Sequence, residues 1–238
     1  MNRVPPYTGR TFFAGSRGFK VLRIWALGMI LPFMATIGCV VTHVGIPGSG
    51  VSLSEIRELE AFDSVSVSGV ATVNIEIGEL AKCEVTADDN LVPLVETKVV
   101  DGELQIGLSE SVSMKTPIVV DLVLPKLRGI NMSGATTGLV SGLSSDSLQV
   151  DLSGASELTI ATGACQQVNV DTSGVAEAQL KDLVVSHAKV STSGTSRVEV
   201  TAKESLIADA SGASEVVCYG NPARVEKDTS GVADIVLN

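Results

Sequence analysis

Aromatic residues and histidines are scarce in this 238-residue sequence. Only 3% of the residues are aromatic, and after Cys39 the aromatic residues are Phe62 and Tyr219. Sugar recognition by ring stacking is therefore disfavoured, because it needs exposed aromatic faces. The two histidines, His43 and His187, offer few general bases, and no GxSxG nucleophile motif is present. Since an activated nucleophile needs a neighbouring base, we expect no catalytic residues and no cofactor.

Paired cysteines are also absent. The four cysteines are far apart, with no CxxC pair and no spacing typical of metal ligands. After Cys39 an odd number of them remains, namely Cys83, Cys165 and Cys218. The sequence therefore does not support a disulfide framework.

The first 38 residues contain no acidic residue and five basic ones, followed by an uncharged run from Ile24 to Gly38. A basic start, an apolar stretch shorter than a membrane span and small residues at its end are typical of a secretory signal peptide. Gly38 directly before Cys39 resembles the cleavage box of bacterial lipoproteins, although Thr36 stands where that box most often has leucine. We predict a lipoprotein-type signal over residues 1–38 and a lipid on Cys39; the alternative is ordinary cleavage nearby, with Cys39 unmodified.

A lipid on Cys39 determines where the protein resides. A diacylglyceryl thioether and an amide-linked acyl chain together give stable membrane attachment. Val40, rather than Asp, follows the cysteine, which in Gram-negative lipoproteins favours the outer membrane. We therefore predict a cell-envelope protein anchored in the outer membrane, without specifying the face. The glycines of 45–50 favour a flexible tether over 39–54.

Loss of the signal would make the chain strongly acidic. It removes five of the 17 basic residues and none of the 27 acidic ones, so the net charge of residues 39–238 is −15. Such a charge repels the phosphate backbone of nucleic acids. We expect no nucleic-acid partner.

A Ser-Gly repeat occupies the second half of the chain. Its serines are separated by 20, 20, 20, 18 and 19 residues, and an earlier copy lies at Ser68. Internal repeats of this length indicate stacked structural units. The serines of the regular series are Ser133, Ser153, Ser173, Ser193, Ser211 and Ser230.

Alignment on the serines gives alternating apolar and polar columns, which is the pattern of β-strands. Seven residues after the serine the column is apolar, and Cys218 occupies it in the fifth repeat, which predicts a packing role. A coil of about 20 residues cannot bury its apolar face alone, so coils must stack. We predict an all-β parallel solenoid over residues 55–238, with coils of about 18–20 residues. An antiparallel sandwich is the alternative.

From about Glu60 onward the sequence resembles a known family. The matching segments, in order, are 61–69, Val73-Asn74-Ile75 with Gly78, 101–106, 124–127, 129–131 and the Ser-Gly repeats. Their order resembles the head domain of putative autotransporter adhesins, called the GIN domain. This resemblance implies a right-handed β-helix of pectin-lyase shape without a conserved catalytic site, and a role in adhesion.

The outward columns carry carboxylates that stacking would bring together. Asp151 and Asp171 fall in one column, and Glu157 and Glu177 fall in another. Carboxylates about 5 Å apart repel each other, and a hard cation such as Ca²⁺ would relieve the repulsion. We therefore treat these four residues as weak candidates for a metal site and prefer a solvated acidic face.

Three functional hypotheses follow. The first is a non-enzymatic envelope lipoprotein whose solenoid surface mediates adhesion or binds an unknown envelope or surface macromolecule. The alternative is a polysaccharide-binding or polysaccharide-processing β-helix protein of pectin-lyase shape. The third is assembly into a homo-oligomer through an open solenoid end, because an uncovered sheet edge invites pairing with another chain.

Overall fold

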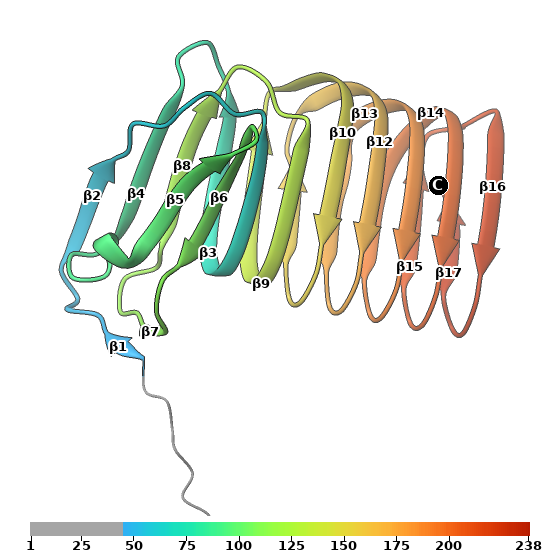
Figure 1. Ribbon diagram of the computed structural model, residues 1–238. Coiled ribbons are helices and arrows are strands. Elements are labelled where there is room, and N and C mark those ends of the chain that lie inside the picture. Colours follow the sequence, from blue (N-terminus) through green and yellow to red (C-terminus); the bar gives the residue numbers. More distant parts are fainter. Residues whose placement is uncertain (1–44) are drawn as a thin grey trace, which may run out of the picture. The chain divides into compact units, whose positions relative to one another are not determined.

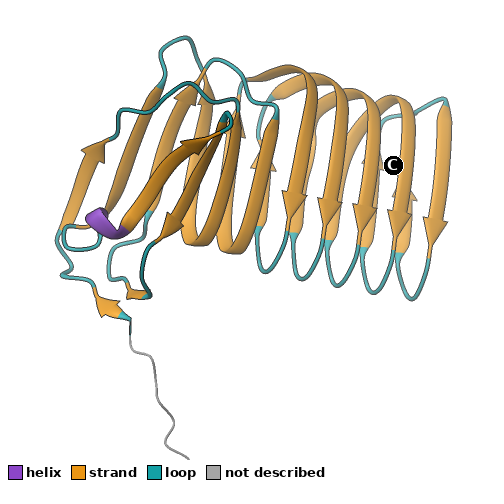
Figure 2. Ribbon diagram, viewed as in Figure 1, coloured by secondary structure: helices purple, strands orange, loops and turns teal. Residues whose placement is uncertain are grey.

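The computed structural model describes residues 45–238, which are almost entirely strands (Figures 1 and 2). No α-helix occurs among these residues; their helical element is one 3₁₀ turn, η1 (Val92–Leu94). Within the described range no helix has the length and apolarity to cross a membrane. The predicted all-β fold is confirmed. The strands are β1 (Ile46–Pro47), β2 (Ser52–Ile56), β3 (Ser64–Ile77), β4 (Lys82–Asp88), β5 (Val95–Val100), β6 (Glu103–Leu108), β7 (Val112–Ser113), β8 (Val119–Leu124), β9 (Gly129–Ser141), β10 (Leu143–Leu152), β11 (Glu157–Ile160), β12 (Gly163–Thr172), β13 (Glu177–Thr192), β14 (Arg197–Ala210), β15 (Glu215–Tyr219), β16 (Arg224–Thr229) and β17 (Asp234–Leu237).

From β9 onward each turn of the chain lies on the turn before it. The strands pair in parallel, and each residue faces its counterpart one repeat away, as in Val150 with Val170 and Val170 with Val190. Between β13 and β14 the offset falls, so Val190 faces Ala208, and the register shifts after Leu180 accommodate the shorter repeat. The ladder offsets in this part of the chain are therefore the predicted 18–20 residues, apart from an offset of 17 where Val184 and Val185 face Thr201 and Ala202.

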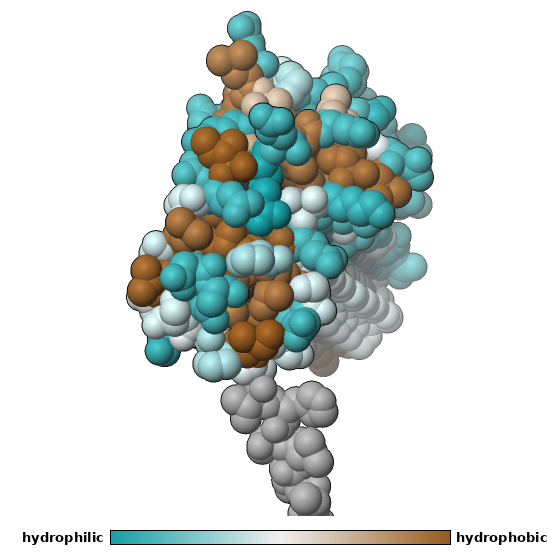
Figure 3. Space-filling view, turned by 60° about the vertical axis from the view of Figure 1, so that its left-hand side comes forward, coloured by the Kyte–Doolittle hydropathy of each residue, from teal (hydrophilic) through white to brown (hydrophobic). Residues whose placement is uncertain are grey.

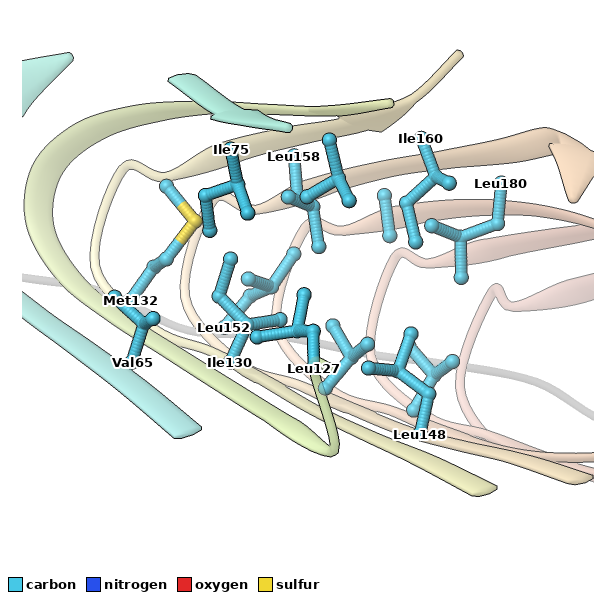
Figure 4. Close-up of a cluster of buried hydrophobic side chains, with 14 of the residues drawn as sticks. Val65, Ile75, Leu127, Ile130, Met132, Leu148, Leu152, Leu158, Ile160 and Leu180 are labelled. Carbon is cyan, nitrogen blue, oxygen red and sulfur yellow. The ribbon is translucent and has the colours of Figure 1, made fainter. Parts of the chain in front are cut away.

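The inward columns form the core (Figure 4). The column seven residues after the serine is buried from Val140 to Cys218, and only its last member, Leu237, is exposed. The column three before the serine is buried from Val150 to Ala208. Because the same side-chain position repeats in every coil, like residues stack on like residues, and one continuous apolar core runs along the repeat.

The Ser-Gly turns stack as closely as the strands. Gly134, Gly154 and Gly174 all have positive φ, at 89°, 75° and 81°. The amide of Val175 donates to the carbonyl of Gly154 at 2.7 Å, and the same bond recurs from turn to turn. Glycine is required at these positions both for its backbone conformation and because the neighbouring turn leaves no space for a Cβ.

Hydroxyl groups enter the core in pairs beside these turns. The buried Thr172 donates to Ser196 of the next coil at 3.1 Å, and Thr192 donates to Ser214 at 2.8 Å. Each of these serines donates in turn to the backbone carbonyl three residues earlier, at 2.9 Å. Each buried hydroxyl in these pairs therefore has a partner, as burial of polar groups demands.

We predict that these pairs behave as units. Ser214→Ala removes the acceptor of a buried donor and should cost about 1–3 kcal/mol, since an unsatisfied buried hydroxyl carries its desolvation penalty. Adding Thr192→Val to that variant should restore most of the loss. Urea unfolding of the two single variants and the double variant measures this coupling, and strictly additive losses would contradict it.

Residues 52–124 differ from the predicted uniform solenoid. Here β4 is antiparallel to both β2 and β8, and β5 is antiparallel to β6. Parallel stacking persists through β3, which pairs with β9, β8 and β6. The sequence between the first Ser-Gly copy and the regular series contains no repeat, so nothing in it specified parallel coils.

The segment from Gly45 to Val51 also differs from prediction, because it is bound to the rest of the domain. It pairs through β1 with β7, and the side chain of Asn90 accepts from Ser49 at 2.8 Å and donates to Pro47 at 2.9 Å. We call residues 45–51 the strap. Over its described residues, 45–54, the segment predicted as a flexible tether is therefore docked chain.

Asp88 holds the strap at its centre. Its fully buried carboxylate accepts hydrogen bonds from the amides of Gly50 at 2.8 Å, Lys115 at 2.8 Å and Thr116 at 3.1 Å, and from the Thr116 hydroxyl at 3.0 Å. Desolvation alone would raise the pKa of this carboxyl, but the hydrogen bonds outweigh it and lower the pKa to about 2. The charged form of Asp88 therefore joins the strap, the end of β4 and the segment before β8.

Candidate functional site

A groove of about 560 Å³ crosses the stacked coils on the face that precedes the Ser-Gly turns. Two outward columns line it: one mainly of aspartates, two residues before each serine, and the serines themselves. We call it the Asp-Ser groove. Its aspartate column consists of Asn131, Asp151, Asp171, Ser191, Asp209 and Asp228.

Glutamine amides separate the carboxylates that were expected to repel. Asp151 and Asp171 are ladder partners, and the Gln149 side-chain amide donates to both, each at 3.1 Å. Glu157 and Glu177 are also partners, and Gln179 donates to both, at 3.3 Å and 3.2 Å. An amide donor thus occupies the space between each carboxylate pair, which offsets part of the repulsion.

Arg197 separates carboxylates in the column that contains Glu157 and Glu177, and it does so with a positive charge instead of an amide. It lies in register between Glu177 and Glu215, with ion pairs to Glu215 and, at 2.8 Å, to Glu199. The hydrogen bond to Glu199, with the nearby carboxylates, raises the pKa of Arg197. One cation therefore breaks the row of like charges in this column.

The structure brings the four metal candidates together only as two separate pairs. The groove includes Asp151 and Asp171 but neither Glu157 nor Glu177, which lie on the strands after the turn. Among residues 45–238 no group of three or more His, Cys, Asp or Glu side chains is placed to hold a metal ion.

We predict that calcium leaves the stability of the domain unchanged. Ca²⁺ takes six to eight oxygen ligands, and each carboxylate pair already binds an amide donor. Calorimetric titration with calcium should show no binding heat and the melting temperature should not rise. Binding heat that disappears in Asp151→Asn/Asp171→Asn would contradict this prediction and restore the cation site.

The remaining cysteines are buried. Cys218 has no exposed surface, which confirms its predicted packing role. Burial raises the pKa of the Cys83 thiol to about 11, despite the opposing effect of Arg57, and burial also raises the pKa of Cys165 and Cys218. Thiols held neutral in this way are poor nucleophiles. Cys39, the predicted lipidation site, lies outside the described residues.

One polar cluster was not predicted. His187 Nδ1 lies 2.9 Å from the Ser205 hydroxyl, and its Nε2 lies 3.7 Å from a Glu204 carboxylate oxygen. Residues of this type form hydrolytic triads. The imidazole and the Glu204 side chain are each more than half exposed, however, and neither residue lines a described pocket that could bind a substrate.

A second groove, about 540 Å³, lies on the side opposite the Ser-Gly turns and includes Lys126, Asp146 and Lys203. These are residue types that polysaccharide cleavage on a β-helix would require. In the described part of the chain no ion pair joins Asp146 to either lysine. The groove thus contains suitable residue types without an assembled acid-base set.

Within residues 129–238 the parallel strands lie in register and present outward columns of side chains, which defines an all-β protein with an extended surface. Residues 61–222 match the family described as "Putative auto-transporter adhesin, head GIN domain". The chain belongs to this family, as its motifs predicted. No curated protein matches the chain.

Several solved structures share the fold. A putative adhesin from Bacteroides fragilis is 19% identical with a TM-score of 0.69, covering 82% of this chain and all of that one. A putative adhesin from Parabacteroides merdae is 17% identical with a TM-score of 0.51, covering 81% and 98%. A putative lipid binding protein from Parabacteroides distasonis is 16% identical with a TM-score of 0.53, covering 81% and 99%. At these identities the likeness shows the fold alone.

Proposed function

We propose that this chain is a non-enzymatic, adhesin-like lipoprotein of the bacterial cell envelope. In this proposal its coils form a right-handed parallel β-helix, Cys39 carries the lipid that anchors it in the outer membrane, and the Asp-Ser groove binds a macromolecule outside the protein. Membership of an adhesin family supports the adhesive role. Assembly through the exposed edge strands of the stack remains a further proposal.

The observation that carries this function is the regularity of the groove. Its serine hydroxyls recur with every coil and its carboxylates occupy four of the six positions of the aspartate column, with adjacent coils about 4.8 Å apart along the stack. Strand ladders and the hydrogen-bonded stack of glycine turns hold both columns in place, so presenting the groove to a ligand needs little further ordering of the chain. A surface with this repeat suits an extended ligand with many donor groups, such as a polysaccharide or a protein surface.

The adhesive function is tested with cells that express the full chain. Asp151→Asn/Asp171→Asn should reduce adherence to a panel of glycan and matrix-protein surfaces by about tenfold, because groove carboxylates are lost at the centre of the contact. Glu157→Gln/Glu177→Gln is the matched control, with the same charge change in another glutamine-bridged pair, and it should adhere like the parent. Equal adherence of both variants would contradict a role for the groove.

The anchor has a test of its own. Palmitate labelling of the parent should be lost in Cys39→Ala, and globomycin should block processing at this site. The Cys39→Ala chain should leave the membrane fraction, since a lipoprotein relies on its acyl chains for attachment. Unchanged labelling of the variant would refute lipidation at Cys39.

A further inference from the structure

Large apolar side chains are exposed on and beside β2, the strand at one edge of the large sheet. Val51, Leu53 and Ile56 are 60%, 45% and 67% exposed. The last two belong to β2, which ends the sheet order and pairs only with β4 among the described strands. Figure 3, which brings this end forward, shows several hydrophobic residues at its surface. We call Val51–Ile56 the β2 edge.

The backbone of the β2 edge is also unpaired on its outer side. The amide of Asp89, directly after β4, donates to Val51 O at 2.8 Å, and the amide of Arg57 donates to Cys83 O of β4 at 2.9 Å. Because antiparallel pairing alternates, the amides and carbonyls of Ser52, Ser54 and Ile56 point away from β4. A surface that covers this edge must accept apolar side chains and also satisfy polar groups, namely the outward backbone groups and the half-exposed carboxylate of Glu55, which is ion-paired with Arg57.

The interface of a bilayer meets both demands. Apolar side chains can enter the boundary between headgroups and acyl chains, while headgroups and water bond to the backbone. The hydrocarbon centre would leave an open edge unsatisfied, so the contact must be shallow. After loss of residues 1–38 the net charge is −15, so an anionic bilayer would repel the chain. A zwitterionic bilayer, which has no net charge, is therefore the suitable surface.

The length of chain before the strap decides which surface is close. Only residues 40–44 separate Cys39 from Gly45, so their Cα atoms can be at most about 20 Å apart. The strap is fixed from its start, with Ile46 N to Ser111 O at 2.8 Å and Gly48 N to Ser113 O at 2.9 Å. Val51 is the last residue of the strap and the first residue of the β2 edge. An acyl chain on Cys39 therefore holds a bilayer within reach of the β2 edge.

We propose that the β2 edge is a membrane-contact surface, on which the domain rests against the bilayer that anchors it. The proposal rests on the lipid at Cys39 proposed above. In this proposal the two parts of the domain have different tasks. β2 contacts the lipid, and the later coils hold the Asp-Ser groove farther from the bilayer. It also gives a role to the docked strap, which fixes the orientation of the domain above its anchor.

Tryptophan fluorescence tests this orientation, because the single tryptophan of the chain, Trp25, lies before Cys39. Leu53→Trp and Ile56→Trp are made separately in the full chain, purified as lipoproteins and reconstituted in phosphatidylcholine vesicles with brominated acyl chains. Brominated lipid should quench both by at least about twofold relative to unbrominated lipid, as expected for interfacial burial. The controls are Val175→Trp and Val232→Trp, on Ser-Gly turns, where the valines are 65% and 81% exposed; these should not be quenched.

The outcomes separate the orientation from the anchor. No quenching at positions 53 and 56 in a chain whose mass shows the lipid would overturn the membrane contact and leave the anchor intact. Quenching confined to positions 175 and 232 would overturn it too, since the turns would then face the bilayer. A further measurement uses iodide as the quencher of the tryptophan at position 53, without vesicles. If iodide quenches this tryptophan less as the protein concentration rises, the β2 edge is covered by a second copy of the chain and not by lipid. A mass without lipid would refute the anchor and, with it, this proposal.

Discussion

Gly174→Ala should destabilise the domain by about 3 kcal/mol, one of the two largest effects that the structure predicts. The φ of Gly174 is +81°, which costs an L-residue about 1–2 kcal/mol. A Cβ at this position would lie 2.6 Å from the carbonyl oxygen of Gly154. That oxygen belongs to the backbone of the preceding turn and accepts the amide of Val175, so it cannot move without breaking the turn ladder.

Gly102→Ala is the matched control for this substitution. Gly102 has the same φ of +81°, but no atom lies within 4 Å of the site where its Cβ would be. Gly102→Ala should therefore cost only the backbone strain, about 1–2 kcal/mol. Guanidinium unfolding of both variants isolates the close approach between turns. Equal losses would show that the turns have room to separate, against the stacking described above.

The stacked coils could be predicted because their sequence repeats. Each column of the repeat places one residue type at one position of every coil, so an apolar column such as Val150 and Val170 has a single way to be buried. Parallel stacking also fixed the neighbours of Asp151 and Asp171 in advance, since residues one repeat apart become ladder partners. The bridging by Gln149 could not be foreseen, because it depends on a side-chain conformation and not on column identity.

The N-terminal part resisted prediction for the opposite reason. β4 and β5 occur once, without copies that could reveal their register, and both pair antiparallel. The glycines of the strap were interpreted as a flexible tether. They serve close packing instead, since a Cβ on Gly48 would lie 2.0 Å from the Asp88 carboxylate. The sequence of the segment shows that glycines are present. Whether the segment is free or docked depends on contacts with residues that are distant in the sequence.

Asp88→Ala should lower the melting temperature on the order of 5 °C, because it removes the acceptor of three amides and one hydroxyl. The strap should loosen first, so limited proteolysis between residues 45 and 57 should become faster. Asp89→Ala is the control: the neighbouring Asp89 is exposed, with its side chain accepting from Ser49 and from the Asn90 amide. It should leave both melting and proteolysis close to those of the parent.

The parent should melt at a higher temperature than Asp88→Asn, and this difference in melting temperature should become smaller as the pH falls. The pKa of Asp88 is about 2 in the folded domain, below the ordinary 3.8. An aspartate whose folded pKa is depressed contributes stability that is fully present above its unfolded pKa and is lost as pH falls through the folded one. The difference in melting temperature should therefore be constant from pH 7 down to about 5 and shrink between about pH 4 and 2. A difference that stays unchanged down to pH 2 would mean that the charge of Asp88 does not hold the strap.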